Sequence, residues 1–168
     1  VPLVARGAGS GLAGAALGTG LQVDFTRYMN RILEFAPDGS WVRVEPGVIM
    51  GELNHRARSF GTFFAPNPSS ENYCSLGGMI GCNSSGSRSV AYGGTKDHVL
   101  ALDVVLHGGE VFTAKSVLRD STEFAQLVQG DGLPARTFRH LISTLEERAD
   151  AVSYTHLRAH ETVLELVC

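Results

Sequence analysis

The chain has 168 residues, with a formal net charge of −3 and 43% hydrophobic residues. This composition indicates a globular fold and argues against disorder. No basic face and no apolar run of about 18 residues stands out, so neither a nucleic acid partner nor a transmembrane segment is predicted.

The first part of the sequence predicts short strands separated by turns. The apolar stretch at 1–5 and the short runs at 21–25, 31–36 and 41–45 have the composition of strands. The last two alternate between apolar and polar residues and are joined by the turn "PDGS". We therefore expect these two strands to pair antiparallel.

The middle of the chain alternates between helical and extended stretches. Apolar residues recur at helical spacing over 48–60, and Gly61 is expected at the C-terminal cap of this helix. Prolines predict an extended loop at 63–72, because each disfavours a helical conformation at the preceding residue. The Gly/Ser-rich stretch 75–87 predicts at most one short helical turn.

The rest of the chain predicts a hairpin and two helices. Residues 98–114 are expected to form two strands joined through the glycine pair at 108–109. A short helix is expected over 120–129, with Asp120 in the position of a capping box. A stronger amphipathic helix begins at Pro134.

The glycine-rich stretch after the first strand raises the question of a dinucleotide site. Gly9, Gly11 and Gly14 fit the G-x-G-x-x-G pattern letter for letter. The next strand begins near Leu21, however, which leaves too little chain after Gly14 for a parallel crossover of roughly a dozen residues. Asp24 also comes earlier than the acidic residue that binds the ribose, about 20 residues on. A nicotinamide-binding Rossmann unit is therefore not expected.

The same glycines still suit a phosphate group. Successive backbone N–H groups without a Cβ can point into one concavity, and Arg6 adds a fixed positive charge. The alternative is an unstructured linker. A second polar cluster contains Ser69, Ser70, the glycine pair at 77–78 and Asn83, whose amide both donates and accepts hydrogen bonds. Two such clusters could close on opposite sides of an elongated cofactor.

Four motifs carry a resemblance to a known family. They are "RGAGSGLAG", "PNPSS", "SLGGMIGCNSSG" and "YGGTKDHVLALDVVLHGGEV". In this order and spacing the chain resembles the FAD-binding PCMH-type domain of the vanillyl-alcohol oxidase superfamily. Within that superfamily it is most similar to FAD-linked dehydrogenases of the D-lactate and glycolate type.

The resemblance implies an α+β fold, a PCMH-type FAD-binding domain of two α+β subdomains that is truncated at its N-terminus. The FAD-binding domain is expected over 1–118, and the helical start of a following region over 119–150. Residues 151–168 look like translated adapter sequence and are expected to be a non-native tail. No metal site is assigned, although His156 and His160 of this tail have a spacing that can bind metal.

The resemblance also implies which residues contact non-covalent FAD. Those implied at the pyrophosphate are Arg6, Gly7, Ala8, Gly9, Ser10, Gly11, Ser70, Gly77 and Gly78. Asn83, Gly86 and Thr95 are implied near the flavin or ribityl chain, and Asp97 and Val99 at its adenine or ribityl end. Members with covalently attached flavin often carry histidine where this chain has Ser10, so dissociable FAD is expected. "NSSG" replaces the family's "NAGG", so a serine stands where the family has a glycine beside the flavin.

The implied reaction is the oxidation of a 2-hydroxy acid by hydride transfer to flavin N5, with D-lactate or glycolate as the type of substrate. The implied electron acceptor is a separate group, for which an iron–sulfur domain or subunit is one candidate. No catalytic acid or base is assigned in this sequence. Two alternatives stay open: a non-redox flavoprotein of the same fold, and a non-functional truncated fragment. Three cysteines without a C-x-x-C pair favour a reducing, cytoplasmic location, with peripheral association at the inner membrane face as a variant.

Overall fold

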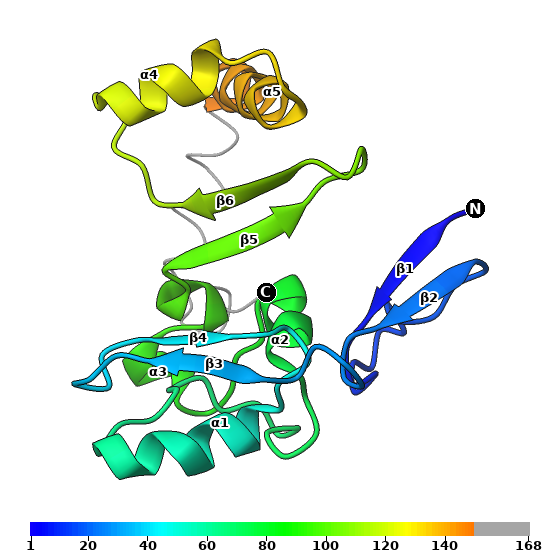
Figure 1. Cartoon of the computed structure of the whole chain (residues 1–168), viewed down its shortest axis with the longest axis vertical. Coiled ribbons are helices and arrows are strands. Elements are labelled where there is room, and N and C mark those ends of the chain that lie inside the picture. Colours follow the sequence, from blue (N-terminus) through cyan, green and yellow to red (C-terminus); the bar gives the residue numbers. More distant parts are fainter. Residues whose placement is uncertain (150–168) are drawn as a thin grey trace. The chain divides into compact units, whose positions relative to one another are not determined.

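The computed structural model describes residues 1–149, which divide into two compact units (Figure 1). The first unit covers residues 1–98 and the second begins at Val99. The suspected tail at 151–168, with His156 and His160, lies outside the described residues. No helix among residues 1–149 is long and apolar enough to cross a membrane.

The first unit opens with a parallel strand pair. β1 (Leu3–Arg6) and β2 (Leu21–Asp24) pair in register from Leu3 opposite Leu21 to Arg6 opposite Asp24. The sequence-based argument against a parallel connection was wrong, because it counted from Gly14, whereas the connection begins directly after Arg6. The whole stretch 7–20 is long enough for the return and contains no helix. We call this stretch the glycine loop.

A hairpin and two helices form the core of the first unit. β3 (Ile32–Phe35) and β4 (Val42–Val44) pair antiparallel, as predicted, and α1 (Met50–Ala57) lies along the hairpin (Figure 1). A 3₁₀ turn extends α1 to Gly61, whose φ of 68° confirms the predicted left-handed cap. The residues buried together in this core are Val48, Met50, Leu53, Cys74, Leu76 and Met79.

The Gly/Ser-rich stretch forms more helix than its composition predicts. α2 (Leu76–Cys82) has seven residues. It is held by Ser75 at its N-cap, whose Oγ accepts the Gly78 N–H, and by the burial of Met79. After α2 come the short α3 (Ser89–Tyr92) and a 3₁₀ turn, Thr95–His98. The strand predicted to start at His98 begins instead at Ala101.

The second unit is a hairpin with two helices. β5 (Ala101–Val105) and β6 (Val111–Lys115) pair antiparallel through the predicted turn, in which Gly109 has a φ of 84°. α4 (Thr122–Gln129) and α5 (Leu133–Glu147) follow. The rings of Phe112 and Phe138 meet edge to face with centroids 6.1 Å apart, so α5 packs on β6.

The cap of α4 is Ser121 rather than the predicted Asp120. Ser121 Oγ accepts the Phe124 N–H at 3.1 Å. We expect Ser121→Ala to lower the free energy of unfolding by about 1 kcal/mol, because one N–H of the first turn loses its partner. Asp120→Ala is the matched control and should change stability little. Urea unfolding followed by circular dichroism measures both, and a larger loss in Asp120→Ala would show that Asp120 is the cap after all.

Candidate functional site

The glycine loop presents a row of backbone N–H groups that have no partner within the described residues. No hydrogen bond there uses the N–H groups from Gly7 to Gly11. Gly9 and Gly14 have φ angles of 70° and 68°, which glycine adopts without strain. Unpaired amides in such a turn attract an anion.

The glycine loop meets the start of α2 at Gly7. A Cβ added to Gly7 would overlap Ser75 Oγ and would lie 3.4 Å from Ser75 Cβ and 3.6 Å from Gly78 N. The two glycine-rich segments predicted to enclose one cofactor are therefore in contact, and a side chain at position 7 would force them apart.

Arg6 supplies the positive charge of the loop. Its Nη2 would lie 2.6 Å from a Cβ added to Gly9, so the guanidinium lies against the loop backbone. Arg6 Nε is 4.0 Å from Asp24 Oδ2 across the strand pair. Two hydrogen bonds from Thr26, the hydroxyl bond first, hold the pKa of Asp24 below its usual value, so this carboxylate is ionised at neutral pH.

The backbone N–H groups of the glycine pair at 77–78 are already hydrogen-bonded within the protein. What the pair provides is the absence of side chains, which lets other groups come close to the backbone. Gly77 N–H donates to Pro46 O at 2.8 Å, and Gly78 N–H to Ser75 Oγ at 3.3 Å. A Cβ on Gly77 would lie 2.7 Å from Pro46 Cβ, so this glycine is required for packing. Gly78 is exposed and would meet only Ser75 Oγ, at 3.2 Å. Of the two glycines, Gly78 is the one whose backbone is open to contact with a ligand.

Three polar side chains, two predicted near the flavin or ribityl chain and one at the adenine or ribityl end, make hydrogen bonds within the protein. Asn83, with a left-handed φ of 46°, ends α2, and its Oδ1 accepts the Lys96 N–H at 2.9 Å. Thr95 is fully buried and donates its hydroxyl to Ser84 O at 2.5 Å. Asp97 Oδ2 accepts the Gly94 N–H at 2.8 Å. These bonds close the segment 83–97 on itself.

Gly86 also has a structural contact. A Cβ there would overlap the carbonyl of Asn67 and would lie 2.8 Å from Pro68 N. The "NSSG" segment therefore packs directly on "PNPSS". Val99 is the first residue of the second unit and is half-buried there.

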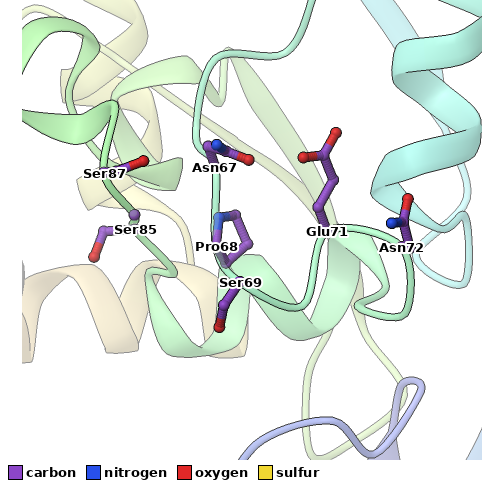
Figure 2. Close-up of a pocket in the computed structure, with 8 residues that line it drawn as sticks. Asn67, Pro68, Ser69, Glu71, Asn72, Ser85 and Ser87 are labelled. Atoms are coloured by element: carbon purple, nitrogen blue, oxygen red, sulfur yellow. The ribbon is translucent and has the colours of Figure 1, made fainter.

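A polar hollow of about 490 Å³ lies where these two segments meet (Figure 2). Its lining residues are Asn67, Pro68, Ser69, Glu71, Asn72, Ser85, Gly86 and Ser87. The sequence predicts site residues Ser69, Ser70 and Gly86 in these segments and notes the serine of "NSSG"; Ser69 and Gly86 line the hollow and Ser70 does not. It does not predict Glu71, Asn72 or Ser87. The carbonyl of Ser70 accepts the N–H groups of Tyr73 and Cys74, each at 2.8 Å, so its backbone is fixed in a turn beside the hollow. A run of small polar residues on both segments was the available signal.

Comparison with known proteins shows the family of this chain. Residues 1–115 match the family described as FAD binding domain, and the chain belongs to this family. FAD is therefore the cofactor, and the α+β fold implied by the PCMH-type resemblance is confirmed.

Particular relatives are D-2-hydroxyglutarate dehydrogenases. The one from Escherichia coli K12 is 51% identical over 106 residues, which are 63% of this chain and 10% of that protein. The one from Pantoea ananatis is 40% identical over 147 residues, 88% of this chain and 14% of that protein. The glycolate oxidase subunit GlcD of Bacillus subtilis is 41% identical over 113 residues, 66% of this chain and 24% of that protein. The chain thus spans between a tenth and a quarter of the length of these relatives.

Solved structures share the fold. Alkyldihydroxyacetonephosphate synthase superposes with a TM-score of 0.59 at 24% identity, over 68% of this chain and 21% of that one. 6-Hydroxy-D-nicotine oxidase from Arthrobacter nicotinovorans gives 0.54 at 25% identity, over 67% of this chain and 24% of that one.

The described residues fit the diphosphate of FAD. The glycine loop offers unpaired N–H groups, Arg6 offers a guanidinium, and the absence of a Cβ at Gly7 lets the loop lie directly against Ser75. Among residues 1–149, no group of three or more histidine, cysteine, aspartate and glutamate side chains could hold a metal ion.

Proposed function

We propose that this chain is the FAD-binding part, over residues 1–118, of a dehydrogenase that oxidises a 2-hydroxy acid. The observation that carries the proposal is the identity of 51% and 40% to two D-2-hydroxyglutarate dehydrogenases. A glycolate oxidase subunit, and a D-lactate dehydrogenase that is 35% identical, add support at a lower level. The names of these four relatives contain three acids, each a 2-hydroxy acid, and the three differ in the substituent on the carbinol carbon.

The residues of this chain hold and orient the cofactor. Arg6 and the N–H groups from Gly7 to Gly11 bind the diphosphate, while the contact of Gly7 with Ser75 keeps the loop on α2. The bonds of Asn83 and Thr95 fix the segment that packs on "PNPSS". When bound, FAD supplies the two-electron acceptor for the hydroxy acid. We assign no base in the described residues.

Binding of FAD by the 168-residue chain is the first test. FAD should bind at one site per chain, measured by the quenching of flavin fluorescence. Dialysis should remove the FAD, because Ser10 stands where members with covalently attached flavin often carry a histidine. A chain that is folded by circular dichroism and leaves FAD fluorescence unchanged would contradict the assignment of the diphosphate site.

The substrate is tested in the holoenzyme that contains this segment. Reduction of an artificial dye should depend on D-2-hydroxyglutarate, D-lactate or glycolate, and the preferred acid names the substrate. The physiological acceptor, for which we propose an iron–sulfur domain or subunit, is then sought by replacing the dye. A flavin-containing holoenzyme that reduces no dye with any of these acids would favour a non-redox flavoprotein of the same fold.

A further inference from the structure

Asp24 has no role in the site described so far, yet its carboxylate is fixed in place. Oδ1 accepts both the N–H of Thr26, at 2.8 Å, and its hydroxyl, at 2.6 Å. Oδ2 is left facing Arg6, whose Nε lies 4.0 Å away. Asp24 and Arg6 are direct partners in the β1–β2 register, and Phe25 N–H donates to Arg6 O at 3.0 Å. Backbone pairing and the Thr26 bonds therefore both fix Asp24 beside Arg6.

The guanidinium of Arg6 lies between Asp24 and the glycine loop. Its Nε end faces the carboxylate, and its Nη2 lies against Gly9. Within residues 1–149, Arg6 donates no hydrogen bond and has no other ion pair, and its side chain is 32% exposed. Its Nη groups are thus available to an anion on the loop.

We infer that Asp24 is a positioning residue that holds the Arg6 guanidinium over the glycine loop for the diphosphate of FAD. An arginine side chain loses conformational entropy when it binds a phosphate group. If Asp24 already restrains Arg6 before FAD binds, less entropy is lost on binding and the affinity is higher. The inference rests on FAD as the cofactor of the family, and it does not depend on which substrate the holoenzyme oxidises.

The opposite role for Asp24 is repulsion of the diphosphate by its negative charge. The order of the groups argues against it, because the cation lies between the carboxylate and the loop. In an Arg6→Gln background, by contrast, only the repulsion would be left. The two roles therefore predict opposite signs for the same substitution.

The experiment is a double-mutant cycle on the full chain, read as the dissociation constant of FAD by fluorescence titration. Asp24→Asn should weaken FAD binding about threefold, the size expected for an exposed ion pair. Arg6→Gln should weaken it about tenfold, because a charge-assisted hydrogen bond to phosphate is lost. In the Arg6→Gln background, Asp24→Asn should leave the affinity unchanged or raise it. Asp24→Glu, which keeps the charge, should restore part of the loss.

A second readout needs no cofactor. The ¹⁵N relaxation of the Arg6 Nε–H group should show greater mobility in Asp24→Asn than in the wild type. Thr26→Val removes the hydroxyl bond to Asp24 and keeps both charges, so it should shift mobility and affinity in the same direction by a smaller amount. This variant keeps the inference testable if Asp24→Asn does not fold.

Three results for the variants overturn the inference: tighter FAD binding by Asp24→Asn, an equal loss of affinity from Asp24→Asn in the Arg6→Gln background, or an Arg6 side chain as restrained in Asp24→Asn as in the wild type. A fourth is a wild-type chain that is folded and binds no FAD. A chain that binds FAD, in a holoenzyme that oxidises no hydroxy acid, refutes the proposed function alone.

Discussion

Gly7→Ala should weaken FAD binding by the full chain about tenfold or more. The added Cβ would overlap Ser75 Oγ, which is buried and serves as the N-cap of α2. Overpacking of this kind costs about 1–3 kcal/mol. Here it would displace the glycine loop from α2 and so move the N–H groups that bind the diphosphate. Fluorescence titration with FAD measures the loss, and the thermal unfolding midpoint shows whether the fold survives.

Two further variants show whether that contact is the cause. Gly11 lies in the same loop with nothing within 4 Å of an added Cβ, so Gly11→Ala should bind FAD nearly as well as the wild type. Ser75→Ala removes the overlapping oxygen, so Gly7→Ala with Ser75→Ala should recover part of the affinity. If Gly11→Ala loses as much affinity as Gly7→Ala, general flexibility of the loop explains the effect and the contact does not.

Gly86→Ala should lower the free energy of unfolding of the first unit by about 3 kcal/mol, at the upper end of overpacking costs. Its Cβ would overlap the Asn67 carbonyl and approach Pro68 N to 2.8 Å. Both are backbone atoms of a proline-stiffened segment, so neither can rotate away. Urea unfolding monitored by circular dichroism measures the change.

Gly81→Ala is the control for this substitution. Gly81 is exposed within α2, and an added Cβ there meets nothing within 4 Å. Because alanine favours helix over glycine, the change should raise stability by about 0.5–1 kcal/mol. Similar midpoints for Gly86→Ala and Gly81→Ala would contradict the close packing of "NSSG" on "PNPSS".

Local sequence patterns predicted most helices and strands of the fold. They failed to predict that β1 and β2 pair in parallel. The alternation at 31–36 and 41–45 and the glycines at 61 and 109 have local causes, and the structure confirms each. The parallel pairing of β1 with β2 depends on how far the glycine loop reaches, which spacing alone does not fix. For the same reason, the sequence does not predict that Asp24 pairs with Arg6.

The polar residues of the site show a second limit of sequence reasoning. Asn83, Thr95 and Asp97 have the chemistry of cofactor ligands, yet the same donors and acceptors also close turns. A motif indicates that such residues belong together without showing which atoms remain free. The N–H groups from Gly7 to Gly11, in contrast, make no hydrogen bond within the described residues, so they are the free donors of the site.

The two hydrogen bonds from Thr95 to Ser84 O have a practical consequence for protein engineering. Both the N–H and the hydroxyl of Thr95 donate to that single carbonyl. Ser84 and Thr95, the two ends of the intervening segment, therefore lie side by side. A peptide tag inserted at the exposed residues 87–88 would separate Gly86 from Ser89, whose N–H donates to Gly86 O at 2.9 Å and whose Oγ accepts the Gly86 N–H at 3.0 Å. The segment between Ser84 and Thr95 thus has fixed ends and a bonded turn inside it, so a reporter is better attached outside it.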